Sequence, residues 1–350
     1  MKKAVLFMLL AAAIASIFMV IPSVLARAGG AEIALVGDIL LDRGVGRAIS
    51  DKGMDYPWLK VGGILKQADI AFGNLECPLT RAEAGGILKN RNLIFKGDPE
   101  NAKELKQAGF DVLNLANNHT MDYGPQGLED TLKTLGETGI AALGGGMNPE
   151  EAAGPVFFKK AGMTIGFLGL SAFPPEGYFF SDEKPDVARA GGVKTVEAIE
   201  KAKKQCDFLI VSFHWGKEFD HYPGAEQKAM ARSAVDHGAD LVIGHHPHVL
   251  QGVEEYGGHL IFYSLGNFVF DRQIPEGTDE TVVLVVAVAG GQLKKAEIVP
   301  VKIGECQPYP AAGEDAEHIL DRLRLFSGKF GANFVMKGDS AEYVVGNPAN

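Results

Sequence analysis

The stretch Leu241-Val-Ile-Gly-His-His-Pro-His-Val249 places three histidines directly after a short apolar run and a glycine. The apolar run predicts a buried strand. Clustered imidazoles at the end of a strand are typical of metal sites, because neutral histidine is a common metal ligand. We therefore expect a sheet whose strand ends carry a metal site that includes some of His245, His246 and His248.

On both sides of this stretch, short β-rich runs alternate with amphipathic helical stretches, which is the pattern of an α/β fold. The predicted strands span residues 33–36, 68–72, 111–115, 163–170, 208–213 and 240–243. The predicted helices span residues 99–108, 124–137, 194–204 and 225–237. Two Gly-Gly pairs that separate later β-rich runs indicate antiparallel hairpins, at residues 257–258 and 290–291.

The end of the chain predicts a short extension to a single domain. No Pro/Ser-rich linker interrupts residues 31–305, so we expect one domain there. A C-terminal helix and tail follow over residues 306–350. The helix is expected at residues 314–326, and the tail from Gly338 is expected to be loosely held.

The first 26 residues differ in character from the rest of the chain. Lys2 and Lys3 form a positively charged start, an uncharged stretch follows, and Val24-Leu-Ala26 fits a small-residue cleavage site. A run of about 20 apolar residues is also long enough to cross a bilayer. Residues 1–26 are therefore either a signal peptide or an N-terminal membrane anchor, and both place the globular part outside the cytoplasm.

Charge and cysteine content narrow the functional classes. The 350 residues carry a formal net charge of -10, and losing Lys2 and Lys3 with the first segment leaves -12. An acidic protein without basic clusters is a poor match for nucleic acid, so we expect no nucleic-acid partner. The three cysteines, Cys77, Cys206 and Cys306, are too few and too widely spaced for a zinc ribbon, and one disulfide among them is left open.

Five predicted strands end in side chains that can bind a metal. These are Asp38, Glu76, Asn118 with His119, His214, and the three histidines of 245–248. Ligands bind at the carboxyl ends of strands in open α/β sheets. Imidazoles with carboxylate and amide oxygens, and no thiolate, suit manganese, iron, zinc or nickel. The set predicts two divalent metal ions that share a bridging carboxylate and activate a water, with a further histidine for proton transfer.

At these residues the chain resembles the CapA family of poly-γ-glutamate capsule biosynthesis proteins, which have a calcineurin-like metallophosphatase fold. The matching motifs are Val36-Gly-Asp-Ile-Leu-Leu-Asp-Arg43, Gly73-Asn-Leu-Glu76, Phe110-Asp-Val-Leu-Asn-Leu-Ala-Asn-Asn-His-Thr-Met-Asp122, Ser212-Phe-His-Trp-Gly-Lys-Glu218, Gly244-His-His-Pro-His-Val-Leu-Gln251 and Phe262-Tyr-Ser-Leu-Gly-Asn-Phe-Val-Phe270. The resemblance implies a two-sheet β-sandwich flanked by helices, in four αββα layers.

The resemblance also implies roles for single residues. Asp38 would bind the first metal, Glu76 would bridge, and Asn118 and His214 would bind the second. His246 and His248 would bind one metal each, and His119 would serve as acid or transition-state stabiliser. Arg43 would contact an anionic substrate, and His245 would be a ligand, a supporting residue or a bystander. The usual Asp-x-His is here Asp38-Ile-Leu40, so one histidine ligand is missing, and Asp42 could supplement the first metal.

Two functions remain open at this point. The first is a metal-dependent hydrolase outside the cytoplasm, acting on a phosphoester or on an anionic capsule polymer such as poly-γ-glutamate. Arg43, Arg91 and Lys96 would then offset the net negative charge. The second is a non-catalytic, membrane-associated component of capsule polymer assembly or export, with membrane-bound capsule synthesis proteins as partners.

Overall fold

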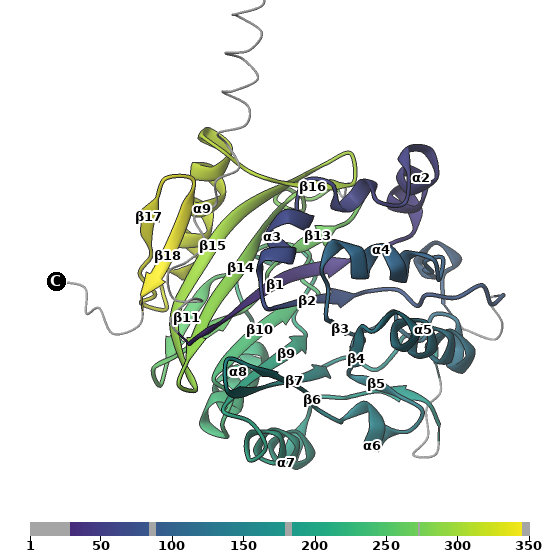
Figure 1. The fold of residues 1–350 in the computed structure, drawn as a ribbon, viewed down its shortest axis with the longest axis horizontal. Coiled ribbons are helices and arrows are strands. Elements are labelled where there is room, and N and C mark those ends of the chain that lie inside the picture. Colours follow the sequence, from purple (N-terminus) through teal and green to yellow (C-terminus); the bar gives the residue numbers. More distant parts are fainter. Residues whose placement is uncertain (1–28, 84–88, 179–183, 272–273, 345–350) are drawn as a thin grey trace, which may run out of the picture.

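The computed structural model describes residues 29–83, 89–178, 184–271 and 274–344, and two large sheets dominate this part of the chain (Figure 1). The first sheet has ten strands in the order β17-β18-β15-β14-β1-β2-β3-β4, with β13 beside β1 and β16 beside β15. Its strands are β1 (Ala31–Ile39), β2 (Ile70–Leu75), β3 (Val112–Asn114), β4 (Ala141–Leu143), β13 (Asn267–Val269), β14 (Glu280–Ala289), β15 (Gln292–Gly304), β16 (Gln307–Pro310), β17 (Val335–Lys337) and β18 (Ser340–Val344).

The second sheet has six strands in the order β11-β12-β10-β9-β7-β6. They are β6 (Val156–Lys160), β7 (Met163–Ser171), β9 (Phe208–His214), β10 (Leu241–His245), β11 (Val253–Tyr256) and β12 (His259–Phe262). A separate antiparallel pair joins β5 (Gly145–Gly146) and β8 (Asp186–Val187). The hairpins expected at the two Gly-Gly pairs are present as β11–β12 and β14–β15.

Helices cover the outer faces of both sheets (Figure 1). The helices are α2 (Arg43–Lys52), α3 (Gly62–Gln67), α4 (Asn101–Ala108), α5 (Gly124–Thr138), α6 (Pro149–Ala152), α7 (Gly192–Lys203), α8 (Ala225–Asp236) and α9 (Glu314–Ser327), with short 3-10 turns η3 (Tyr56–Trp58) and η4 (Arg91–Leu93). One apolar cluster joins the first sheet to α2, α3, α4 and α5, and another joins the second sheet to α7 and α8.

A third apolar cluster fills the space between the two sheets. Phe72 of β2 and Phe167 of β7 stack there with ring centroids 5.8 Å apart, and Ile33 and Ile243 belong to the same cluster. A strand that is buried on both faces is apolar along most of its length. For this reason the sequences of β9 and β10 do not alternate between apolar and polar residues. The structure thus confirms the predicted α/β fold of two sheets flanked by helices.

Parallel pairing brings the predicted site residues to the strand ends. β1 is parallel to β2, and Asp38 lies opposite Asn74. In the second sheet β9 is parallel to β10, and His214 lies opposite His245. A glycine precedes Asp38 because the chain is crowded there: a Cβ on Gly37 would lie 1.9 Å from the carbonyl oxygen of Gly266.

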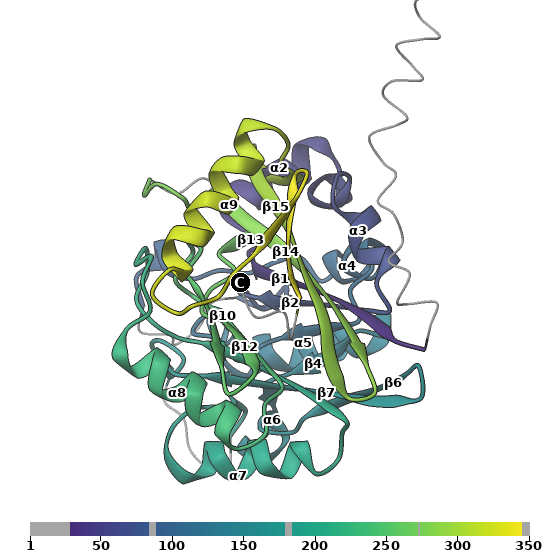
Figure 2. The ribbon, with the colours of Figure 1, turned by 90° about the vertical axis from the view of Figure 1, so that its left-hand side faces the viewer.

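The C-terminal residues differ in part from the expectation. The helix is present as α9, and Figure 2 shows it beside β15. The expectation of a loose tail is wrong for residues 340–344, because β18 pairs with β15 in antiparallel register, Ala296 opposite Tyr343. Four α9 side chains, from Ala316 to Leu323, belong to the cluster between the sheets. The predicted boundary at residue 305, between the domain and the C-terminal extension, stays a prediction.

Two further expectations concern the N-terminus and the cysteines. Residues 1–26 lie outside the described residues, so their role stays a prediction. Among the described helices, none combines the length and apolarity needed to cross a bilayer. Cys77, Cys206 and Cys306 are all free thiols, and burial raises the pKa of Cys77 and raises that of Cys206 to about 11.

Candidate metal centre

The six predicted metal ligands are all buried in the structure. They are Asp38, Glu76, Asn118, His214, His246 and His248, and the most exposed of them, His246, shows 8% of its surface. Each lies in the last residues of a strand or in the loop that follows it, and the apolar residues of these strands fix it in the layered core. Burial of so many polar side chains at one place is costly unless each finds a partner.

The ligand atoms form two groups that share Glu76. Glu76, His246 and His248 each offer an atom within 4.8 Å of the others, and so do Asp38, Glu76 and His214. A carboxylate common to two groups has the position required of a bridging ligand. The grouping places Asp38 with His214, whereas the resemblance assigns them to different ions, so the allotment of ligands to each ion stays a prediction.

Several polar atoms at the centre have no hydrogen-bond partner among the described residues. They include both carboxylate oxygens of Glu76 and Nδ1 of His246. An unsatisfied buried polar group costs about 1–3 kcal/mol, and more if it is charged. A divalent cation would satisfy these atoms together, and carboxylate with imidazole is a donor set for manganese, iron, zinc or nickel. The residues therefore fit a metal.

The electrostatics of the centre also suit metal ligands. Burial lowers the pKa of His214 well below its usual value and that of His246 to about 3, so both imidazoles are neutral, as ligands must be. Burial alone would raise the pKa of Asp38, but the imidazoles of His245 and His248, 3.2 Å and 3.3 Å from its carboxylate oxygens, hold that pKa well below its usual value. Asp38 is therefore a carboxylate at neutral pH.

Glu76 and His248 shift in the opposite direction. Burial, and then the nearby charge of Asp38, raise the pKa of Glu76 well above its usual value. Burial alone would lower the pKa of His248, but Glu76 and Asp38 raise it to about 9. In the metal-free protein His248 therefore holds a proton at neutral pH, Glu76 keeps its proton to a higher pH than a free carboxyl group does, and cations would compete with these protons on binding.

The backbone is strained where the histidines turn into the centre. His246 has φ of 94° and His248 has φ of 59°, a left-handed region that residues other than glycine seldom adopt. Arg43 has φ of 50°. Such conformations cost of order 1–3 kcal/mol each and cluster at functional sites. Gly244, just before these histidines, allows the backbone to pass close to Tyr263, since a Cβ at position 244 would lie 2.0 Å from the carbonyl oxygen of Tyr263.

His119 lies beside the ligands in a polar cluster of its own. Its Nδ1 is 2.8 Å from Oδ2 of Asp122, and its ring stacks on Phe95 at 4.4 Å between centroids. Lys89 Nζ donates to Asp122 Oδ1 at 2.9 Å and forms an ion pair with Glu176 at 3.1 Å. Burial lowers the pKa of His119. With Nδ1 tied to Asp122, Nε2 is the nitrogen free for proton transfer.

Buried amides hold the first ligands in place. The Asn74 side chain donates to Asp38 Oδ1 at 2.9 Å and accepts from Asn114 at 2.9 Å and from Asn117 at 3.3 Å. Asn267 Oδ1 lies 3.0 Å from Nδ1 of His248. These four asparagines belong to the quoted sequence motifs, but their supporting roles were missed: Asn74 and Asn267 contact predicted ligands, and Asn114 and Asn117 contact Asn74.

Three other site residues lie in loops and were missed altogether. Phe173 packs on His246, with ring centroids 4.5 Å apart, and Glu176 accepts from the Asn118 amide at 3.2 Å. The third is Lys89. A lone lysine, glutamate or phenylalanine in a loop carries no periodic pattern, so the sequence offers no signal for any of them.

The remaining predicted residues lie near the centre in other roles. Asp42 caps α2: its two oxygens accept from the backbone amides of Arg43 and Lys96, both at 2.7 Å, and neither ligand group includes it. His245 Nδ1 lies 3.2 Å from Asp38 Oδ1. It is a neighbour of Asp38 and is absent from both ligand groups.

Arg43, the predicted substrate contact, has a defined position. Its guanidinium pairs with Asp271 and lies over two aromatic rings, those of Phe95 at 4.8 Å and Phe270 at 5.4 Å. Phe270 in turn lies 5.0 Å from the ring of His248. Arg43 is thus next to the centre, and its contact with an anionic substrate stays a prediction.

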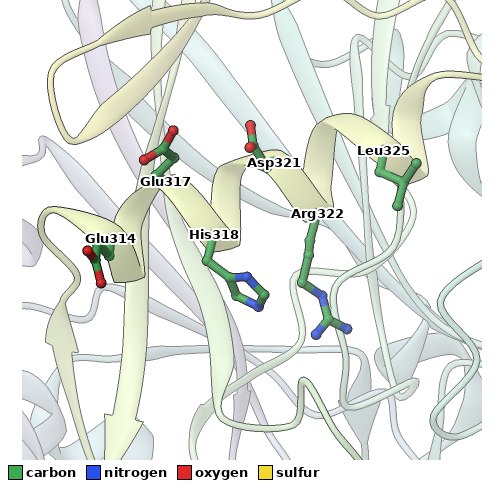
Figure 3. Close-up of a pocket in the computed structure, with 6 residues that line it drawn as sticks. All are labelled: Glu314, Glu317, His318, Asp321, Arg322 and Leu325. Carbon is green, nitrogen blue, oxygen red and sulfur yellow. The ribbon is translucent and has the colours of Figure 1, made fainter.

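A hollow of about 350 Å³ on α9 lies apart from the predicted ligands (Figure 3). It is lined by Glu314, Glu317, His318, Asp321, Arg322 and Leu325, all from one face of the helix. None of these residues was predicted at the site. A hollow lined by one face of a single helix offers no convergent set of groups for chemistry.

Fold and centre together define the class of this protein: a layered α/β protein with a candidate metal centre at the carboxyl ends of its parallel strands. The family model described as "Bacterial capsule synthesis protein PGA_cap" matches residues 32–272. The chain therefore belongs to this family, and the predicted membership is confirmed.

Two individual relatives agree with this assignment. The chain is 36% identical to the PGA biosynthesis protein CapA of Bacillus subtilis (strain 168), over 79% of this chain and 73% of that protein. It is 34% identical to the capsule biosynthesis protein CapA of Bacillus anthracis, over 89% of this chain and 76% of that protein. Among solved structures, a hypothetical protein from Thermus thermophilus aligns with a TM-score of 0.45 at 18% identity, over 79% of this chain and 98% of that one.

Proposed function

We propose that this protein is an extracytoplasmic, metal-dependent hydrolase of the phosphoesterase kind that acts in the synthesis or processing of poly-γ-glutamate or a similar capsule polymer. The observation that carries the proposal is Glu76, a buried carboxylate that has no hydrogen-bond partner in the described part of the chain and that two groups of ligand atoms share. The polymer follows from the names of the relatives, which are capsule and PGA biosynthesis proteins. The location follows from the character of residues 1–26.

The chain supplies the holding groups and the proton-transfer group. Asp38, Glu76, Asn118, His214, His246 and His248 would hold the ions. Bound divalent ions supply Lewis-acid activation of an ester and of the attacking water. His119 transfers a proton through Nε2, because Asp122 holds its Nδ1. Arg43 offers a cation to an anionic substrate, and its guanidinium is held near the rings of Phe95 and Phe270.

The test measures metal binding and hydrolysis on the same protein. The purified chain is stripped with a chelator, loaded with Mn²⁺, Fe²⁺, Zn²⁺ or Ni²⁺, and analysed for bound metal. It is then assayed on phosphoesters and on poly-γ-glutamate. His248→Ala removes a predicted ligand, and His237→Ala is the matched control, a partly exposed histidine at the end of α8 that bonds Ser233.

We expect the wild type and His237→Ala to bind metal and hydrolyse a substrate, and His248→Ala to lose both. A wild type that binds no divalent metal under any loading condition contradicts the hydrolase. A wild type that binds metal, yet hydrolyses none of the substrates, favours the non-catalytic role in capsule polymer assembly instead.

A further inference from the structure

We propose that Glu176 and Lys89 are positioning residues of the candidate metal centre, with Glu176 fixing the side-chain amide of Asn118 and Lys89 fixing Glu176. This inference rests on the proposed function, because it concerns a ligand of the proposed ions. Neither residue belongs to a motif at a strand end. Both reach the centre from loops: Glu176 lies in the loop after β7, and Lys89 lies just before η4.

The contact between Glu176 and Asn118 selects one of two amide orientations. An asparagine amide presents an acceptor oxygen on one side and two N–H donors on the other, and only the oxygen can bind a cation. Oε1 of Glu176 accepts from Asn118 Nδ2 at 3.2 Å, and an ionised carboxylate can only accept. The oxygen of Asn118 therefore faces His214, 2.9 Å from its Nε2.

A backbone bond anchors the same loop to the same residue. The amide of Glu176 donates to the carbonyl oxygen of Asn118 at 3.4 Å. The loop begins with Ala172, whose amide donates to the carbonyl oxygen of His214 at 2.8 Å. Between them Phe173 packs on His246. The loop after β7 is thus tied to three predicted ligands, and Glu176 lies where it can hold one of them.

Lys89 restricts the rotamers that the Glu176 side chain can adopt. The Glu176 side chain is 48% exposed, and a half-exposed glutamate loses rotamer entropy when it is held in one position. Lys89 is only 4% exposed and lies 3.1 Å from Oε2 of Glu176 and 2.9 Å from Oδ1 of Asp122. An ammonium buried between two carboxylates is fixed by both, so Glu176 is held between Lys89 and Asn118.

The experiment measures Co²⁺ binding to the whole chain, with the visible absorption spectrum of the bound ion as the second readout. Glu176→Ala removes the acceptor, and Glu176→Gln keeps an acceptor oxygen while losing the charge. Lys89→Met removes the anchor. Glu100→Ala is the matched control: Glu100 is 47% exposed and pairs with Lys103 on the surface.

We expect Glu176→Ala to weaken Co²⁺ binding about 10- to 100-fold, the usual effect of losing a supporting contact to a ligand, and to change the spectrum. Glu176→Gln should recover most of the affinity, and Lys89→Met should fall between the two. Glu100→Ala should match the wild type. A wild type that binds no Co²⁺ overturns the metal centre and this inference with it. If Co²⁺ binds the wild type and Glu176→Ala alike, with the same spectrum, only the positioning role is overturned.

Discussion

Two glutamates of this protein are almost equally buried and have opposite surroundings. Glu76, after β2, exposes 1% of its surface, and Glu254, in β11, exposes 5%. Arg232 donates to Oε1 of Glu254 at 2.7 Å, and the hydroxyl of Tyr263 donates to Oε2 at 2.5 Å. Neither oxygen of Glu76 has a hydrogen-bond partner among the described residues.

The difference separates a carboxylate with structural partners, Glu254, from a candidate metal ligand, Glu76. Burial of a charge is tolerated when partners compensate it, and Arg232 and Tyr263 do so for Glu254. Glu76 has no such hydrogen-bonded partners among the described residues: the imidazoles of His214 and His248 lie 3.8 Å from its Oε1, and it belongs to both groups of side chains that could hold a metal ion. A fold retains a costly buried carboxylate where a ligand offsets the cost. The comparison therefore predicts that the two residues respond differently to the same substitution.

The largest expected difference is in metal binding. Glu76→Gln replaces the shared carboxylate by a neutral amide, and we expect more than the roughly 100-fold loss of affinity that follows removal of a supporting residue. Glu254→Gln should leave the affinity unchanged, because Glu254 belongs to neither ligand group. Titration with Mn²⁺ or Zn²⁺ by calorimetry measures both. If Glu76→Gln and Glu254→Gln bound metal with equal affinity, Glu76 would not be a metal ligand of the kind proposed.

The next difference is in the free energy of unfolding, and here the substitution of Glu254 is the one that should have the effect. Glu254→Ala leaves the Tyr263 hydroxyl buried without its acceptor, which should cost about 1–3 kcal/mol. The lost pairing with Arg232 adds little, because that side chain is 43% exposed and water can solvate it. Urea unfolding of metal-free protein gives the free energies. Tyr263→Phe is the companion variant, and a Glu254→Ala protein as stable as the wild type would refute the structural role.

The contrast also shows what the sequence could and could not predict. The apolar runs predicted β1, β2, β3, β7, β9 and β10, and the Gly-Gly pairs predicted the hairpins β11–β12 and β14–β15, because a buried strand carries its own hydrophobic signal. The short or peripheral strands β4, β6, β13, β16 and β17 were missed. Candidate ligands at the carboxyl ends of those strands, such as Asp38 and His214, were predicted together with the strands. The final strand was missed: Ser340–Val344 pairs with β15, and that pairing, not its own composition, makes it a strand.

The parts of the site that escaped prediction depend on loops. Lys89 and Glu176 lie far apart in the sequence and meet only because the layers bring their loops together. Asp42, proposed as an extra ligand, directly precedes a helix, and an aspartate in that place indicates an N-cap. Local patterns reveal strand-end ligands, whereas contacts between distant loops come from tertiary structure.

The pH dependence of stability should separate wild type from Glu76→Gln. Burial, then Asp38, raise the pKa of Glu76 above its usual 4.5, so the folded metal-free protein keeps a proton that the unfolded chain releases. Stability then falls as the pH rises above 4.5, by at most about 1.4 kcal/mol per pH unit. Gln cannot titrate, so the stability of the variant relative to the wild type should rise as the pH increases from 4.5 toward neutral.

Chemical denaturation of both metal-free proteins between about pH 4 and 8 measures this difference. It should be constant below pH 4.5, where both folded and unfolded states of the wild type hold the proton, and should grow above that value. Glu254→Gln, measured alongside, serves as the reference for removing a buried carboxylate that has partners. A difference between wild type and Glu76→Gln that is flat across the range contradicts the raised pKa.

The smallest expected effect concerns the two aspartates of the first motif. Asp38 lies in one of the two ligand groups, whereas Asp42 caps α2 and accepts from two backbone amides. Asp42→Ala should cost about 1 kcal/mol of stability through the lost cap and leave metal affinity unchanged, while Asp42→Asn, which keeps a capping oxygen, should cost less. Thermal unfolding with and without Mn²⁺ measures both. If Asp42→Ala weakened metal binding as Asp38→Ala does, Asp42 would be a ligand after all, and the missing histidine of the first motif would have its replacement.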